Sequence, residues 1–295
     1  MKGLRKWILF DYANVLLMLF MMVITAYPMI FAIAGAFSEG NDYMRGGIYF
    51  YPRKPTLDNF RVLFRNNQII QAFKISAMKS IIGTFTNLIV TLLVAYAMTR
   101  PDLKLKRVYQ LVIMVPMFFG GGLIPYFMLI RDLGLYDTFL VYIIPGMFSI
   151  WTMLIMQSYI RGLPDSIIES AEIDGAGEYM ILARIVAPLC VPMFAALILF
   201  GVVGHWNSYF DSMMFTTRTE LQTIQYYLRK IIVDVNQSNS MYDQAIKFAS
   251  DIKDKPIAQT LKLAAMVTTA APILAVYPFL QRYFVKGITL GSIKG

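Results

Sequence analysis

The chain has 295 residues, of which 57% are apolar and only 15% are charged, whereas soluble domains average roughly 45–50% apolar and about 25% charged residues. So few polar side chains exclude an ordinary soluble domain, a disordered chain and a collagen, and the single cysteine, Cys190, excludes a disulfide scaffold and is expected to be a small apolar filler. The net charge of +9 suggests nucleic-acid binding, but the basic residues are scattered between apolar blocks. A membrane protein explains both features, because a charge at the bilayer centre costs about 2.5–3.5 kcal/mol.

Six apolar blocks are long enough to cross a bilayer, which takes roughly 20 residues per helix. They occupy residues 13–37, 80–98, 108–130, 138–159, 189–210 and 261–280. The basic start with Lys2, Arg5 and Lys6 and the small residues at 34–36 also fit a cleaved signal peptide. However, the first apolar run of about 25 residues exceeds the roughly 7–15 of a signal sequence. We predict an all-α, polytopic membrane protein with six transmembrane helices, the first of them uncleaved.

The short loops orient these helices. The loop at 100–107 holds Arg100, Lys104, Lys106 and Arg107, whereas the loop at 131–137 holds one arginine and two aspartates. Because positive charge accumulates on cytoplasmic loops, the first loop is expected inside. Both termini and the segment 161–188 then lie in the cytoplasm, and the segments 38–79 and 211–260 face outward. The whole chain, 1–295, is predicted to form a single transmembrane domain.

Several of the spans contain residues that bend or break helices. These residues are Pro28, Pro116, Gly120, Gly121, Gly122, Pro125, Pro145, Pro272 and Pro278. Proline and glycine are tolerated in membrane helices where neighbours satisfy the freed backbone groups. Two interpretations stay open: bends that line a transport cavity, and ordinary kinks between closely packed helices.

The cytoplasmic segment 161–188 carries helix signals without an apolar run of spanning length. Ser166 precedes Glu169 by three residues, the spacing of a capping box, which predicts that a short helix starts there. Gly175 follows Asp174 and predicts the end of that helix, since glycine readily takes the left-handed conformation. A second helical stretch, 178–186, leads to Pro188 at the next span.

The spacing within this segment resembles the signature of permeases of the ATP-binding-cassette (ABC) importers. That signature reads Glu-Ala-Ala, three residues, Gly, nine residues, Ile-x-Leu-Pro. The chain has Glu169-Ser170-Ala171, then Gly175, then Ile185-Val186-Ala187-Pro188, with every spacing kept. Ser170 and Ala187 depart from the pattern by small changes. A helical hairpin that merely connects two spans is the alternative.

The resemblance extends over the whole chain to the carbohydrate-uptake branch, in particular to the shorter partner of the maltose-type permease pair. It rests on the segments 55–60 (PTLDNF), 206–210 (WNSYF), 277–287 (YPFLQRYFVKG) and 291–295 (GSIKG). Within this branch the chain is most similar to permeases for complex oligosaccharides, including polyuronate or alginate-type importers.

The resemblance implies a non-enzymatic permease subunit, half of a heterodimer, in the bacterial plasma (inner) membrane. Its implied partners are an ATP-binding-cassette ATPase dimer, a second permease subunit, an extracytoplasmic solute-binding protein, the saccharide and membrane lipid, with no nucleic acid. The chain has no phosphate-binding Gly-x-x-x-x-Gly-Lys loop. We therefore expect no cofactor on this chain, with ATP and Mg bound by the partner ATPase.

Contact with the ATPase is expected at the first cytoplasmic helix and its glycine turn, docked as a helix in a groove. The residues expected there are Ile167, Ile168, Glu169, Ala171, Asp174, Gly175 and Ala176. The substrate pathway is expected to use aromatic faces and hydrogen-bonding groups. The candidates are Trp206, Asn207, Tyr209, Asp211, Trp151, Tyr142 and Phe119. The only histidine, His205, is either packed or part of the path.

Other interpretations stay open at this point. The cytoplasmic segment reports the energy source and not the cargo, so a polyamine or phosphate permease is an alternative. An intramembrane enzyme would need a paired nucleophile and base or a metal-ligand set within the spans, and the sequence offers neither catalytic nor metal-binding residues. The segment 211–260 holds Leu221, Ile224, Leu228 and Ile231 at helical spacing. That helix either touches the solute-binding protein or packs on the permease itself.

Overall fold

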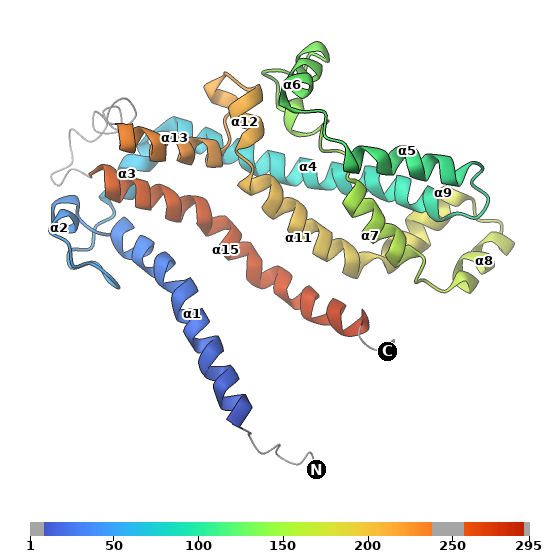
Figure 1. Cartoon of the computed structure of the whole chain (residues 1–295), viewed down its shortest axis with the longest axis horizontal. Helices are drawn as coiled ribbons and strands as arrows, with labels where there is room; N and C mark the ends of the chain where they lie inside the picture. The colour runs from blue at the N-terminus through green and yellow to red at the C-terminus, as the bar shows by residue number, and fades with distance from the viewer. Residues whose placement is uncertain (1–8, 238–256, 292–295) are drawn as a thin grey trace. The chain divides into compact units, whose positions relative to one another are not determined.

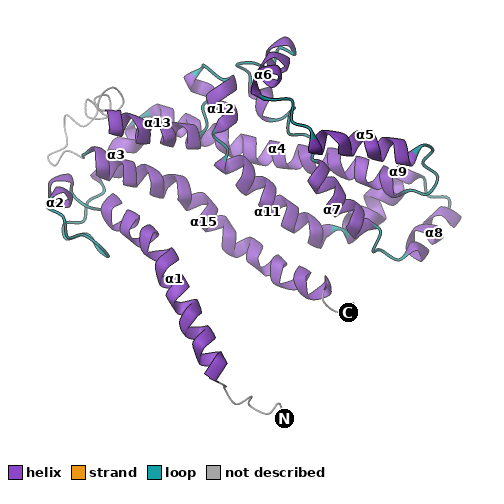
Figure 2. Cartoon of the chain, in the orientation of Figure 1, coloured by secondary structure: helices purple, strands orange, loops and turns teal. Residues whose placement is uncertain are grey.

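The computed structural model describes residues 9–237 and 257–291. Within them the chain is helical without any β-strand, apart from an isolated bridge between Ser38 and Pro55 (Figure 2). This confirms the all-helical prediction. Contacts divide the chain into two compact units, Met1–Ile69 with Leu228–Ala271 and Ile70–Tyr227 with Pro272–Gly295. The basic start at Lys2, Arg5 and Lys6, the part of the 211–260 segment at 238–256 and the final residues 292–295 lie outside the described residues.

The helices are labelled in Figure 1. Those that lie in the first unit or begin or end there are α1 (Leu9–Ala36), α2 (Gly40–Met44), α3 (Asp58–Arg65), α4 (Asn67–Thr99), α13 (Ile224–Gln237) and α15 (Ala258–Gly291). The second unit holds most of α4 and the helices α5 (Lys106–Phe118), α6 (Leu123–Asp132), η1 (Phe139–Tyr142), α7 (Ile150–Ile160), α8 (Asp165–Ile173), α9 (Glu178–Ile181), the π-helical turn η2 (Leu182–Val186), α10 (Ala187–Leu189), α11 (Val191–Asn207), α12 (Phe210–Phe215) and η3 (Thr219–Leu221).

Asn59 holds the first unit together from its interior. Its side chain is buried, and its Nδ2 donates to the carbonyl oxygens of Ala36 at 2.8 Å and Ser38 at 2.9 Å. Its Oδ1 accepts from the hydroxyl of Thr260 at 2.9 Å. The 55–60 segment thus ties the end of α1 to the start of α15. A side-chain carbon on Gly35 would lie 2.4 Å from Leu263 Cδ1, so only glycine permits this close approach.

Among the described residues, three helical stretches are long and apolar enough to cross a membrane: Leu9–Ala36, Asn67–Thr99 and Ala258–Val276. Two bent pairs bring the number to five if each pair counts as one span. These agree with five of the six predicted blocks. The block at 138–159 contains η1 and only an 11-residue helix, α7, so one continuous spanning helix there is wrong. The count of six stays a prediction.

The block at 108–130 is also not a single helix. Helices α5 and α6 meet at 119°, with residues 119–122 between them outside any helix. Gly122 has φ +82°, a backbone conformation that glycine adopts at little cost. The triple glycine therefore breaks this span instead of merely bending it. Likewise, α11 follows the Glu178–Leu189 stretch at 78°.

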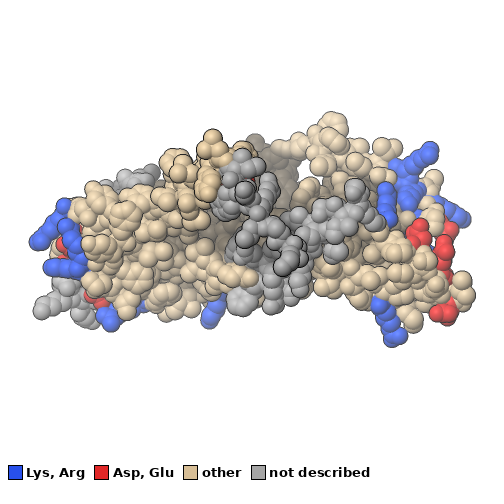
Figure 3. Space-filling view, turned by 90° about the horizontal axis from the view of Figure 1, so that it is seen from below, with Lys and Arg blue, Asp and Glu red and all other residues tan. Residues whose placement is uncertain are grey.

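The core of the second unit lies where α4, α7 and α11 meet the α9–η2 stretch (Figure 1). Its fully buried members include Ala95, Met153, Met156, Val186 and Cys190, whose exposed fraction is 0%. Cys190 is thus a packed apolar residue, as predicted. In this unit, charged side chains on the face in Figure 3 gather at the end that carries α8 and α9, and uncharged surface lies beside them. That separation suits an element that leaves the bilayer at this end.

Candidate functional site

The segment 161–188 folds as a helix, a glycine turn and a second helix, but its first helix starts differently from the prediction. Helix α8 begins at Asp165, and Pro164 occupies the N-cap without a side-chain hydrogen bond. The predicted capping box of Ser166 and Glu169 is therefore wrong. Proline has no N–H and its backbone here is extended, so the helix starts directly after it. Ser166 instead lies inside the helix, where its carbonyl accepts from the Ser170 hydroxyl at 2.7 Å.

The end of α8 matches the prediction. Gly175 has φ +79°. Its N–H donates to the Glu172 carbonyl at 3.0 Å, and the N–H of Ala176 donates to the Ala171 carbonyl at 2.9 Å. These two bonds form a Schellman motif, in which a left-handed glycine satisfies the last carbonyls of the helix. The turn therefore fixes the direction in which the chain continues to α9.

The residues expected to meet the ATPase fall into two groups. Ala171 is 8% exposed and packs in the core of this chain, with Ile168 and Ala176 half-buried against it. These three residues pack within this chain, and their predicted contact with the ATPase stays a prediction. The exposed group consists of Ile167, Glu169, Asp174 and Gly175.

Two large apolar side chains in this segment were missed by the sequence reasoning. Ile173 is 86% exposed and Tyr179 is 84% exposed. Both lie next to the glycine turn, one before it in α8 and one after it in α9. Ile173 is four residues after Glu169, a spacing that places both on one helix face and was available in the sequence.

Arg100 joins this segment to the end of α4. Its Nε donates to Glu178 Oε1 at 2.9 Å, and its guanidinium also pairs with Glu172. The side chain of Arg100 is 14% exposed, and the hydroxyl of Tyr96 donates to Glu178. One arginine thus holds one carboxylate from α8 and one from α9. Burial alone would lower the pKa of Arg100, but the hydrogen bond to Glu172 and the nearby negative charges raise it above its ordinary value.

The sequence reasoning used Arg100 only as a topology-setting charge. The signal that it missed is the pair of glutamates flanking the glycine turn, Glu172 and Glu178, which need a cation between them. Lys106 supports the same corner, because its Nζ donates to the carbonyl of Arg100 at 3.1 Å.

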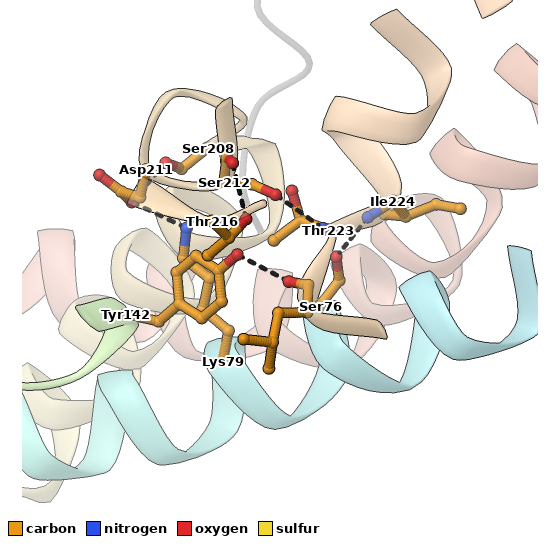
Figure 4. A network of polar contacts seen from close by, with 10 residues as sticks. Ser76, Lys79, Tyr142, Ser208, Asp211, Ser212, Thr216, Thr223 and Ile224 are labelled. Atoms are coloured by element: carbon orange, nitrogen blue, oxygen red, sulfur yellow. Dashed lines mark hydrogen bonds and ion pairs between the residues drawn. The ribbon is translucent and has the colours of Figure 1, made fainter. Parts of the chain in front are cut away.

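A second polar cluster lies at the other end of α4 (Figure 4). Lys79 donates to Asp211 Oδ2 at 2.9 Å, and its side chain is only 1% exposed, against 35% for Asp211. The ammonium also lies 4.8 Å from the centre of the Tyr142 ring. Ser208 donates to the same carboxylate oxygen at 3.0 Å. A buried lysine is thereby supplied with a counter-ion, a hydrogen bond and an aromatic face.

Neighbouring hydroxyl oxygens in Figure 4 accept hydrogen bonds from backbone N–H groups at the start of α13. The N–H of Ile224 donates to Ser76 Oγ at 2.8 Å, and the N–H of Thr223 donates to Ser212 Oγ at 3.1 Å. The hydroxyl of Tyr142 donates to the Leu221 carbonyl at 2.7 Å. Because the first N–H groups of a helix have no partner within it, side chains from α4 and α12 take that role. The cluster is therefore a structural joint between three elements.

The structure does not bring the seven predicted substrate residues together. Trp206 is 5% exposed and packs edge-on against Phe73, with ring centres 5.2 Å apart. Tyr142 and Asp211 belong to the joint just described, and Asn207 accepts from Gln225 at 3.2 Å. Tyr209 is partly exposed, and Phe119 lies in the break between α5 and α6. Trp206 and Tyr142 are buried in packing contacts of this chain, and their role in a substrate pathway stays a prediction.

Trp151 is the one predicted substrate residue that lines a described cavity. This cavity has a volume of about 290 Å³ and lies between α4, α7 and α11. His205 also lines it, together with four polar residues that the sequence reasoning missed: Thr84, Asn87, Ser149 and Thr152. Their polarity within apolar helices was the signal, since polar residues in spans mark interiors and pathways. Three elements far apart in sequence supply them, which no local pattern reveals.

Comparison with known proteins agrees with this architecture. A family model described as "Binding-protein-dependent transport system inner membrane component" matches residues 81–290. The chain is 31% identical to the polygalacturonan/rhamnogalacturonan transport system permease protein YtcP of Bacillus subtilis (strain 168), with 97% of this chain and 99% of that protein covered. It is also 31% identical to protein LplC of the same organism, with 97% and 95% covered.

A solved structure shares the fold as well. A chain of a bacterial ABC transporter involved in the import of the acidic polysaccharide alginate superposes with a TM-score of 0.86 at 27% identity, covering 93% of this chain and 96% of that one. The matched family region includes the whole helix, glycine turn and helix segment and the cavity between α4, α7 and α11. The chain therefore belongs to the family of inner membrane components of binding-protein-dependent transport systems.

Proposed function

We propose that the chain is the permease subunit of an ABC importer for oligosaccharides and forms half of its translocation pathway. The observation that carries this proposal is the folded α8, glycine turn and α9 unit, found in a chain of this family. No step of catalysis is assigned to the chain. ATP and Mg are bound by separate ATPase subunits, and a second permease subunit supplies the other half of the pathway.

The ATPase docks on the exposed side of this unit. Ile167, Ile173 and Tyr179 present apolar surface, and Glu169 presents a carboxylate. An amphipathic helix of this kind suits a groove on a partner. Arg100 transmits the movement, because it connects α8 and α9 to the end of α4, a helix long enough to cross the bilayer.

Six spans with both termini in the cytoplasm fit this arrangement. The remaining span, fourth in chain order, would consist of η1, α7 and the residues between them, because α7 is too short to cross the bilayer alone. The segments 38–79 and 211–260 would then face the solute-binding protein. In helix α13, Ile224 and Ile231 are buried. This burial supports the interpretation that the apolar face of α13 packs on the permease itself.

The proposed cargo is an oligosaccharide that contains uronate residues. Two observations support it: the polygalacturonan/rhamnogalacturonan permease is 31% identical over nearly the full chain, and the superposed structure belongs to an importer of an acidic polysaccharide. Polygalacturonan and alginate share the carboxylated sugar ring. A neutral oligosaccharide, a polyamine or phosphate are outcomes that the following experiment distinguishes.

The complex of this chain with its partner permease, ATPase and solute-binding protein should import uronate oligosaccharides. Purified complex in proteoliposomes would be supplied with trigalacturonate, an alginate trimer, an arabinan trimer, spermidine or phosphate, each with the binding protein. We expect ATP-dependent uptake of at least one uronate trimer. Uptake of only the arabinan trimer would correct the cargo, and uptake of only spermidine or phosphate would contradict the oligosaccharide proposal.

Coupling should depend on the left-handed turn at Gly175. Gly175→Pro places a residue restricted to φ near −65° at a position with φ +79°. We expect uptake to fall by about tenfold or more while the protein still reaches the membrane. The measurement is uptake beside ATP hydrolysis stimulated by the binding protein.

The chain offers a matched control for this substitution. Gly177 has φ −73°, which suits proline, and it lies two residues further along the same loop. Gly177→Pro should therefore keep most of the uptake. Equal loss in both variants would show that the loop does not depend on the geometry of Gly175.

A further inference from the structure

We propose that the cavity between α4, α7 and α11 is a subsite that holds one pyranose ring of the cargo during passage. This inference rests on the proposed function and deepens it, since it assigns a saccharide subsite to this subunit. The cavity is separate from the Lys79 joint, from the α8–α9 unit and from most residues predicted for the pathway.

The size of the cavity suits one sugar ring. Its volume of about 290 Å³ lies at the lower end of the ~300–1,000 Å³ of sites for drug-sized ligands. It therefore has room for a single ring and not for a whole oligosaccharide. A chain passing through the permease would place one ring at a time in it.

The aromatic wall of the cavity is formed by Trp151 and Phe200. Their rings contact edge to face with centres 6.2 Å apart, and they are 52% and 54% exposed. Large aromatic side chains that remain accessible in a cavity offer flat apolar surface to a ligand. The C–H face of a pyranose ring presents the complementary apolar surface.

Polar groups with spare hydrogen-bonding capacity complete the lining. Thr84 is 1% exposed, and its hydroxyl has no hydrogen-bond partner within the described part of the chain. Asn87 donates its Nδ2 to the Gly146 carbonyl at 2.8 Å, which leaves its Oδ1 as an acceptor. His205 adds an imidazole. A buried unsatisfied hydroxyl is destabilising, so a hydroxyl-rich ligand gains affinity by satisfying it.

The same polar groups indicate that the opening does not face lipid tails. Thr84 and Asn87 lie in the apolar part of α4, and His205 lies in α11. Polar residues inside membrane spans are found where they face a bundle interior or a water-filled cavity. A hydrocarbon chain would leave the Thr84 hydroxyl unsatisfied and the Asn87 Oδ1 unused, whereas sugar hydroxyls both donate and accept.

Glycines keep the cavity open. A side-chain carbon on Gly201 would lie 2.7 Å from Thr84 Cγ2, so this glycine permits the close approach of α11 to α4. A side-chain carbon on Gly204, by contrast, would meet no atom within 4 Å. Gly204 therefore lines free space at the cavity wall, and a side chain added there starts without a clash at its Cβ.

The first experiment fills the cavity. Gly204→Leu should lower trigalacturonate uptake by the reconstituted complex about tenfold or more, with ATP hydrolysis stimulated by the binding protein largely kept. Gly204→Ala is the matched control, since one methyl group leaves most of the space free, and its uptake should stay close to that of the parent. Uptake by Gly204→Leu equal to that of Gly204→Ala would overturn the subsite.

The second experiment does not require transport. Cys190 is the only cysteine and is 0% exposed, so Gly204→Cys provides a single accessible thiol. A charged, membrane-impermeant methanethiosulfonate reagent should label Gly204→Cys in the purified complex, with or without ATP, but not the parent. Trigalacturonate at millimolar concentration should slow the labelling several-fold. No labelling would place the opening against lipid, and labelling without protection would remove the saccharide assignment.

The two experiments separate this inference from the proposed function. If the parent complex imports trigalacturonate while Gly204→Leu does so equally well, the subsite fails and the function stands. If the parent imports no saccharide, the function fails, and protection of Gly204→Cys by trigalacturonate alone decides whether the cavity binds a sugar ring. Should Gly204→Leu not reach the membrane, the labelling of Gly204→Cys decides in the same way.

Discussion

Arg100→Glu is expected to abolish coupled uptake while the protein is still inserted in the membrane. The substitution replaces the cation between Glu172 and Glu178 with a third carboxylate. Arg100 itself is 14% exposed, although Glu172 and Glu178 are 44% and 53% exposed and water screens part of their attraction to it. The new carboxylate would lie between two others, so like-charge repulsion replaces that attraction. We expect α8 and α9 to separate from the end of α4. The measurements are uptake and co-purification of the ATPase with the permease.

A control with the same charge change is available in the same loop. Lys104 is exposed, so Lys104→Glu should leave uptake nearly unchanged. A partial rescue by Glu178→Arg in the Arg100→Glu background would locate the effect in this contact. If Lys104→Glu and Arg100→Glu lower uptake equally, the loss reflects loop charge and membrane topology and not the connection to the glycine turn.

Asp211→Asn is expected to destabilise the permease more than Lys79→Met. Lys79 is 1% exposed and loses its counter-ion in the first variant, whereas Asp211 is 35% exposed and keeps access to water in the second. An uncompensated buried charge costs about 3–5 kcal/mol. The midpoint of thermal unfolding of the detergent-solubilised protein should therefore fall most for Asp211→Asn.

The combined variant tests the origin of this loss. Lys79→Met together with Asp211→Asn removes both charges and should unfold at a higher temperature than Asp211→Asn alone. Asp132→Asn is the matched control, because Asp132 is 66% exposed and pairs with Arg131 at 3.8 Å, an interaction worth little. Additive losses in the double variant would contradict an ion pair at this joint.

The sequence was most informative where the determining contacts are local. The left-handed turn at Gly175 and the end of α8 follow from one residue and its neighbours, so spacing alone predicted them. The predicted start of α8 was wrong although its determinants are also local, because two start signals compete in the same segment. Pro164 set the helix start, and the capping-box spacing of Ser166 was coincidental.

The substrate residues could not be predicted in the same way. Aromatic and polar residues at the end of α11 were chosen by type, yet Trp206 packs on Phe73 of α4. The cavity takes Thr84 from α4, Ser149 from the N-cap of α7 and His205 from α11. Which residues share a cavity depends on helix packing over long sequence separations, which a single sequence does not encode in any short pattern.

The prolines and glycines in the apolar blocks predicted where a helix breaks but not how it breaks. The triple glycine marked the position of the break between α5 and α6, but composition cannot supply its angle of 119°. The apolar block at 138–159 shows the same limit, since a hydropathy count does not distinguish a spanning helix from a short helix preceded by irregular backbone.

The open backbone at 119–122 also bears on what must surround the chain. Residues 119–122 are not helical although they lie in an apolar block of spanning length. Peptide groups without partners cost several kcal/mol each in hydrocarbon, so irregular backbone at membrane depth is stable only against protein or water. We expect lipid acyl chains to be excluded from this break. A single copy of the chain in a bilayer would then need water or another polypeptide to cover these peptide groups, so assembly with a partner would favour stable insertion.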